Sequence, residues 1–159
     1  MGQPARRDGQ AHHQHGNPAL RGSTTMNLEI GTELPPFVRE TRMENWNRFA
    51  AVMDEFVPHH MDDDDGKKSG MPGAFGMGNL QSSYMHNLIR DWMGEKGRIR
   101  NFTIQWAQPN FKNTIVTARG RITAVEDTSA GKEVALELWT EDNNDRRLAN
   151  GTAKVVFSA

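Results

Sequence analysis

Residues 78–94 have the sequence GNLQSSYMHNLIRDWMG, and they predict the longest helix of the chain over residues 79–93. Large apolar side chains recur there at close to helical spacing over about four turns, and Gly94 supplies a stop signal. These apolar residues are Leu80, Tyr84, Leu88, Ile89, Trp92 and Met93. Gly78 would lie at the N-terminal end of this buried helix. Backbone N–H groups without helical partners and the positive end of the helix dipole meet at such an end.

The chain after this helix changes to a period of two. Val, Ile, Thr, Leu and Phe alternate or cluster in four segments, separated by turn signals. The predicted strands are residues 99–106, 115–125, 132–141 and 147–157. Long antiparallel strands after one long apolar helix predict an α+β domain whose sheet wraps the helix. Such a sheet leaves a free edge, so we expect dimerisation by edge pairing.

Upstream of the long helix, the pattern predicts a short edge strand, a first helix and a long loop. The strand covers residues 37–40, and apolar residues at helical spacing predict a helix over residues 43–53. Thr41 offers an N-cap hydroxyl, with Glu44 three residues on as its capping-box partner. Residues 56–78 are rich in Gly, Pro and Asp and predict one long loop, a kind of segment that is often functional.

Composition narrows the possible functions. The 159 residues are enough for one domain with a real core, and 19 basic and 20 acidic residues give a net charge of −1, which does not indicate a nucleic-acid binder. The absence of cysteine excludes disulfides and thiolate metal sites. No apolar run approaches the roughly 20 residues of a membrane span, and the first residues lack the apolar core of a signal peptide. We therefore expect a cytoplasmic protein.

Two polar segments are expected to lie outside the chemistry. Residues 1–25 hold three histidines, four glycines and two prolines with hardly any large apolar group, which predicts a disordered extension before a domain spanning residues 28–159. Its histidines, His12, His13 and His15, have no partner ligand at a sensible spacing, so no metal site is expected. The four adjacent aspartates of residues 62–65 predict a solvated face, because calcium loops space their ligands.

The segment EFVPHHMD, residues 55–62, is the candidate active site. Glu55 precedes His60 by five residues with a proline between them, an arrangement that can direct a carboxylate and an imidazole at one water molecule. Asp54 and His59 are also five residues apart and form an alternative dyad.

Several separated motifs occur in an order that resembles the MaoC-like hot-dog dehydratases, the (R)-specific enoyl-CoA hydratases. The resemblance covers roughly residues 30–157 and implies a single hot-dog fold, with a long central helix wrapped by an antiparallel sheet. The adjacent His59 and His60 also resemble the small subunits of heteromeric steroid side-chain hydratases. The matching positions are Phe49-Ala50-Ala51, Phe56, Pro58, His60, Asp62, Met71-Pro72-Gly73, Gly78, Leu80, Pro109-Asn110-Phe111 and the strand from Val116 to Val125.

The chain departs from the pattern of this family at several positions. Glu55 replaces an aspartate, Val57 an asparagine and Met77 a histidine, and Asn113-Thr114 replaces Gly-Asp. Pairing Asp54 with His59 restores the aspartate, but this register misplaces Phe56, Pro58 and Asp62. Glu55 with His60 is therefore the favoured dyad.

The resemblance implies a lyase of fatty acid or steroid metabolism that needs no cofactor or metal. Glu55 and His60 would add water across a trans-2-enoyl-CoA thioester, and the Gly78 amide would stabilise the thioester oxygen. Asp62 would order the loop rather than perform chemistry. An acyl pocket would be lined by Met71, Phe75, Met77 and Tyr84. Basic residues available for the CoA phosphates are Lys67, Lys68, Arg98, Arg100 and Lys112.

Two other functions fit the same resemblance. Val57 and Met77 favour an inactive subunit that binds acyl-CoA or supports a second hot-dog chain, so the implied assembly is a homodimer or a heteromer. A hot-dog thioesterase is third, because Asn79 and Gln81 stand where such enzymes usually carry an acid.

Overall fold

The computed structural model describes residues 26–129 and 131–158. The expected N-terminal extension, with His12, His13 and His15, lies outside the described residues. The elements, in chain order, are β1 (Phe37–Thr41), α1 (Met43–Met53), α2 (Pro58–Met61), α3 (Asp63–Lys68), α4 (Gly78–Met93), the 3₁₀ helix η1 (Gly94–Lys96), β2 (Gly97–Trp106), β3 (Thr114–Thr128), β4 (Gly131–Asp142) and β5 (Arg147–Phe157).

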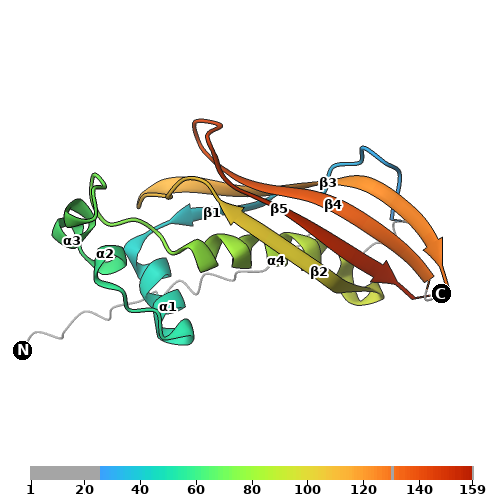
Figure 1. Ribbon diagram of the computed structural model, residues 1–159, viewed down its shortest axis with the longest axis horizontal. Helices are drawn as coiled ribbons and strands as arrows, with labels where there is room; N and C mark the ends of the chain where they lie inside the picture. Colours follow the sequence, from blue (N-terminus) through green and yellow to red (C-terminus); the bar gives the residue numbers. More distant parts are fainter. Residues whose placement is uncertain (1–25, 130, 159) are drawn as a thin grey trace, which may run out of the picture.

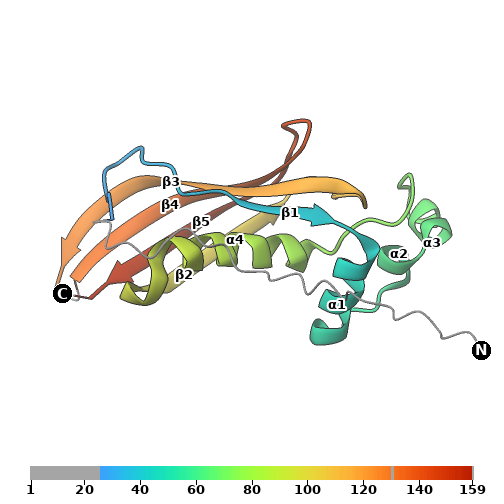
Figure 2. The same cartoon turned by 180° about the vertical axis from the view of Figure 1, so that it is seen from behind.

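The strands form one antiparallel sheet with the order β1-β3-β4-β5-β2. The sheet curves around α4, while α1, α2 and α3 gather beyond one end of it (Figures 1 and 2). Ile122 pairs with Leu136, and Leu138 pairs with Gly151, so the middle of the sheet presents apolar residues to the helix. This confirms the predicted α+β hot-dog fold, including the long central helix and the four strands that follow it.

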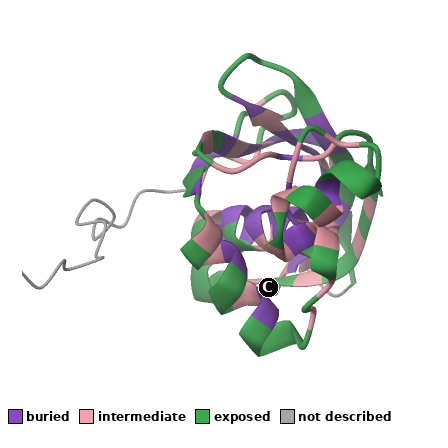
Figure 3. Ribbon diagram, turned by 90° about the vertical axis from the view of Figure 1, so that its left-hand side faces the viewer, coloured by how far each residue is buried: buried purple, intermediate pink, exposed green. Residues whose placement is uncertain are grey.

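The core lies between α4 and the concave face of the sheet. Met85, Leu88 and Ile89 of α4 are fully buried, as are Val134 and Leu138 of β4. Figure 3 shows these buried segments along α4 and the strands. Each large apolar side chain removed from water in this way stabilises the fold by about 1.5–3 kcal/mol. Among the described residues, no helix combines the length and apolar character that crossing a membrane requires.

The predicted N-cap at Thr41 is wrong. Strand β1 continues through Thr41, which pairs with Thr114 and is fully buried. Its hydroxyl lies 2.8 Å from the carbonyl oxygen of Phe111 and 3.0 Å from that of Thr114, so it binds the β2–β3 connection instead of capping α1. Arg42 takes the N-cap position, and its backbone N–H donates to the Asn45 side chain.

The predicted loop over residues 56–78 contains two short helices, α2 and α3. Asp62 is the N-cap of α3, and its carboxylate accepts hydrogen bonds from the backbone N–H groups of Asp64 (2.8 Å) and Asp65 (3.1 Å). Asp62 therefore orders this segment, as expected. Asp63 forms an ion pair with Lys112 at 2.6 Å and accepts a hydrogen bond from the Ala74 N–H. The aspartate run is thus a helix start and a cross-link rather than only a solvated face.

Candidate active site

His60 lies in α2 and is 7% exposed. Its Nδ1 is 2.7 Å from the carbonyl oxygen of Phe75. A carbonyl oxygen only accepts hydrogen bonds, so this contact assigns the proton to Nδ1. In the neutral ring Nε2 is then an acceptor. Burial lowers the pKa of His60 below its ordinary value, although the hydrogen bond to Phe75 acts in the opposite direction. Neutral His60 therefore presents a basic nitrogen at neutral pH.

Glu55 lies in the connection between α1 and α2 and is half-buried. Its Oε2 accepts a hydrogen bond from the side-chain amide of Asn79 at 3.3 Å. The Glu55 charge also raises the pKa of His60, but it contributes less than burial, the hydrogen bond to Phe75 and the charge of His59. The sequence did not indicate that Asn79 holds Glu55, because the two residues are 24 positions apart in the chain.

The alternative dyad occupies different surroundings. Asp54 is exposed and ends α1 with a left-handed backbone, at φ 53°. The His59 ring stacks on Phe75 with their centroids 4.8 Å apart and an angle of 4° between the rings. The His59 ring also meets the His60 ring edge-on at 4.3 Å. Both rings therefore pack against the side chain of Phe75, but the ring nitrogen of His60 also binds the Phe75 carbonyl group.

A cavity of about 240 Å³ lies beside His60, at the N-terminal end of α4. It is slightly smaller than the roughly 300–1,000 Å³ of typical ligand pockets. Its walls come from α2, the glycine-rich loop before α4, the first turn of α4, the end of β2 and the start of the β2–β3 connection. The lining residues are His60, Met71, Phe75, Gly76, Gly78, Gln81, Trp106, Ala107, Gln108 and Pro109.

The four residues predicted to line an acyl pocket divide into two pairs. Met71 and Phe75 line the cavity, but Met77 and Tyr84 do not. Met77 is fully buried in the hydrophobic core, and the Tyr84 ring packs against Phe37 with a centroid distance of 5.8 Å. The cavity residues Gln81 and Trp106 carried no such prediction.

Gly78 is the first residue of α4 and forms part of the cavity wall. Its carbonyl oxygen accepts a hydrogen bond from the Trp106 indole at 2.9 Å, and a Cβ at this position would lie 2.9 Å from the indole ring. Its backbone N–H belongs to the first helical turn, which has no intrahelical acceptor. The arrangement therefore brings a hydrogen-bond donor, an imidazole and a carboxylate to one end of α4.

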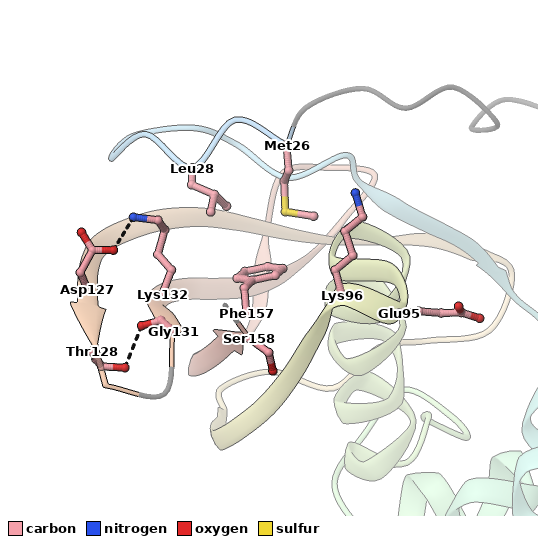
Figure 4. A pocket seen from close by; sticks show the side chains of 10 residues that line it. All are labelled: Met26, Leu28, Glu95, Lys96, Asp127, Thr128, Gly131, Lys132, Phe157 and Ser158. Carbon is pink, nitrogen blue, oxygen red and sulfur yellow. Dashed lines mark hydrogen bonds and ion pairs between the residues drawn. The ribbon is translucent and has the colours of Figure 1, made fainter.

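A larger cavity, of about 780 Å³, lies at the opposite end of α4 (Figure 4). The helix has 16 residues and is therefore about 24 Å long, so the two cavities are well separated. Lys132 and Asp127 form an ion pair at 2.6 Å in its wall, and Thr128 donates to the Gly131 carbonyl. None of the predicted site residues borders this cavity. Within the described part of the chain, no group of His, Asp and Glu side chains is arranged to hold a metal ion.

The lowered pKa of His60 predicts a measurable pH dependence. The ordinary value is 6.5, so the unfolded chain takes up this proton at a higher pH than the folded protein does. Stability attributable to His60 is therefore present above about pH 6.5 and falls as the pH decreases toward the folded pKa. We expect the His60 ring signal to titrate below 6.5 in an NMR experiment, with His60→Gln identifying the signal. A midpoint above 6.5 would show that Glu55 and Phe75 outweigh burial.

Comparison with known proteins supports the fold. No protein-family model matches the sequence, and no curated protein matches it significantly. Among solved structures, an (R)-hydratase from A. caviae involved in PHA biosynthesis has a TM-score of 0.75 and 19% identity, covering 84% of this chain and 99% of the other. The ChsH1-ChsH2 complex from Mycobacterium tuberculosis has a TM-score of 0.73 and 18% identity, covering 81% of this chain and 98% of the other. The MaoC-like dehydratase from Rhodospirillum rubrum has a TM-score of 0.71 and 17% identity, covering 83% of this chain and 94% of the other. The fold of this chain is therefore the hot-dog fold that these hydratases and dehydratases have.

Proposed function

We propose that the chain is an enoyl-CoA hydratase of the MaoC-like family, a lyase that converts a trans-2-enoyl-CoA into a 3-hydroxyacyl-CoA. The observation that carries this proposal is the hydrogen bonding of the two ring nitrogens of His60. Its Nδ1 is fixed on the Phe75 carbonyl at 2.7 Å, which leaves Nε2 to the cavity at the start of α4. Glu55 stands at the same end of α4, where its carboxylate accepts a hydrogen bond from Asn79, and its charge raises the pKa of the imidazole.

The reaction follows from these groups. Glu55 and His60 hold one water molecule, and the dyad takes a proton from it as the water oxygen bonds to C3 of the enoyl group. The electron pair of the C2–C3 double bond moves toward the thioester, whose oxygen gains enolate-like charge. The Gly78 amide stabilises that charge. The dyad then gives the proton to C2, so that one water molecule has been added and the catalyst is unchanged.

The surroundings of the cavity suit a thioester more than a highly charged group. Met71, Phe75 and Trp106 give it an apolar wall. Three of the basic residues considered for the CoA phosphates already have carboxylate partners, because Lys67, Lys68 and Lys112 pair with aspartates of residues 63–65. Arg98 and Arg100 are exposed, but they lie near the start of β2, whereas the cavity borders Trp106 at the end of this strand, so neither stands beside the cavity.

A second hot-dog chain is the proposed partner, in a homodimer or a heteromer. Among the described strands, β2 lies at an edge of the sheet, with β5 as its one neighbour. An open edge of this kind offers unpaired backbone groups to another strand. A heteromer would also be consistent with the second candidate function, a non-catalytic acyl-CoA-binding subunit. The observation in its favour is that Met77, at the position of the family histidine, is fully buried in the core and is not part of the cavity beside His60.

The experiment that tests the function follows absorbance at the enoyl-thioester band with crotonyl-, octenoyl- and a bulky ring-bearing enoyl-CoA. We expect the isolated chain to remove the absorbance of at least one substrate and to form the 3-hydroxyacyl product, identified by mass spectrometry. A thiol reagent in a parallel sample reports released CoA, and its release would indicate a thioesterase. Binding of these thioesters without turnover would contradict the proposal and favour the non-catalytic subunit.

A further inference from the structure

We infer that the side-chain amide of Gln81 is a second hydrogen-bond donor to the thioester oxygen, acting beside the Gly78 amide, and that Thr140 positions it. This inference rests on the proposed function, because it assigns a further residue to the same cavity. Gln81 lies in the cavity wall together with His60 and Gly78.

Gln81 is an unusual member of the buried face of α4. It is 2% exposed, whereas the other buried residues of the helix are apolar or aromatic: Leu80, Tyr84, Met85, Leu88, Ile89 and Met93. A buried amide costs free energy unless its polar atoms have partners. A leucine would satisfy the packing of this position, so the amide group itself requires an explanation.

The oxygen end of the Gln81 amide has a firm partner. Thr140, on β4, is fully buried, and its hydroxyl donates to Gln81 Oε1 at 2.6 Å. The orientation of the amide is assigned by its other neighbour: the Gln108 carbonyl oxygen only accepts, so the NH₂ group faces Gln108 and the amide oxygen is left to accept from Thr140. Thr140 therefore fixes the direction in which Gln81 can donate.

The nitrogen end has spare donor capacity. Nε2 carries two hydrogens, and one is directed at the carbonyl oxygen of Gln108, at the long distance of 3.5 Å. Among the described residues, no acceptor is found for the other hydrogen. Gln108 is itself a cavity residue, so the NH₂ group of Gln81 lies at the cavity wall. A bound oxygen atom would complete its hydrogen bonding.

The position of Gln81 on α4 suits the same oxygen that Gly78 would bind. Residues three apart in a helix lie on one face, about 5–6 Å from each other. Gly78 contributes a backbone N–H at the positive end of the helix, and Gln81 contributes a neutral N–H one turn farther on. Two donors converging on one oxygen are the geometry that stabilises a developing oxyanion. A carboxylate at position 81 would repel that charge, which explains an amide here.

The test combines kinetics with the infrared carbonyl band of bound butyryl-CoA labelled with carbon-13 at the thioester. Butyryl-CoA has no double bond to hydrate, so this readout does not depend on turnover. The variants are Gln81→Leu, Thr140→Val and the double variant. Asn87→Leu, which makes the same change at an exposed position of α4, is the control. Thermal unfolding is measured for each, and the double variant removes both polar partners at once, which limits the cost of an unpaired buried group.

We expect Gln81→Leu and the double variant to lower kcat for hydration about a hundred-fold, with little change in KM. The bound carbonyl band should move back toward its position in free butyryl-CoA. Thr140→Val should give intermediate values in both measurements, and Asn87→Leu should match the wild type. An unchanged band and an unchanged kcat in folded Gln81→Leu would overturn the inference. If Gln81→Leu moves the carbonyl band but the wild type does not hydrate any enoyl-CoA, the proposed function is overturned and Gln81 remains a hydrogen-bond donor to the thioester oxygen. Absence of any butyryl-CoA binding by the wild type would overturn both.

Discussion

His60→Ala is expected to lower kcat for enoyl-CoA hydration about 1,000-fold, since a positioned acid–base residue contributes roughly 100- to 10,000-fold. The imidazole is the group that presents a basic nitrogen to the cavity while its other nitrogen is held by Phe75. Glu55→Gln should cause a loss of similar size. The amide that it introduces can still accept the hydrogen bond from Asn79, but it cannot take a proton.

The controls for this prediction are His59→Ala and Asp54→Asn, which remove the alternative dyad. The His59 ring stacks on Phe75, and Asp54 is exposed at the end of α1, so both variants should keep most of the activity. Initial rates are measured at the enoyl-thioester band, and binding of butyryl-CoA shows whether each variant still forms the pocket. Loss of turnover confined to Asp54→Asn and His59→Ala would mean that the other dyad works.

The sequence predicted the large elements of the fold because their signals are local and repeated. Apolar residues at helical spacing predicted α4 over residues 79–93, and the structure has it over Gly78–Met93. Alternation predicted the four long strands, whose observed ends differ by a few residues. The short helices α2 and α3 were both missed, and α3 depends on a cap at Asp62 and on an ion pair between Asp63 and Lys112. The partners in that ion pair are 49 residues apart, which no local pattern reveals.

The candidate site was predicted less completely, for a related reason. The motif around Glu55 and His60 led to the end of α4 where the cavity lies, and their catalytic roles stay a prediction. A glycine-rich loop does not disclose which of its side chains face a pocket: Phe75 borders the cavity, whereas Met77 lies in the hydrophobic core. Gln81 drew attention only because it is not an acid. Its hydrogen bond to Thr140, 59 residues away, gives it a direction and thereby a possible function.

Gly66→Ala is expected to destabilise the protein by about 3 kcal/mol, at the upper end of the usual cost of overpacking. Gly66 is buried in α3 against the backbone of the glycine-rich loop. An added Cβ would overlap the carbonyl group of Gly73 and lie 2.6 Å from the backbone nitrogen of Ala74. Backbone atoms cannot rotate away as a side chain can, so the loop must shift. That shift would move the Phe75 carbonyl, which holds His60.

Gly66→Ala should therefore lower both the free energy of unfolding and the hydration rate. The comparison with Gly70→Ala separates a shift of the glycine-rich loop from a loss of stability alone. A Cβ at Gly70 would meet no atom within 4 Å, but its φ of 82° is unfavourable for alanine, which costs about 1–2 kcal/mol. Urea unfolding should show the larger loss for Gly66→Ala, and the hydration rate of the folded protein should fall for that variant alone. Equal stability and full activity in both variants would show that the position of the glycine-rich loop does not depend on α3. If only Gly66→Ala lowers the hydration rate, the packing of α3 on Gly73 and Ala74 determines where the Phe75 carbonyl, the acceptor for His60, lies. The short helix, although it contributes no residue to the cavity, would then control the orientation of the imidazole inside it.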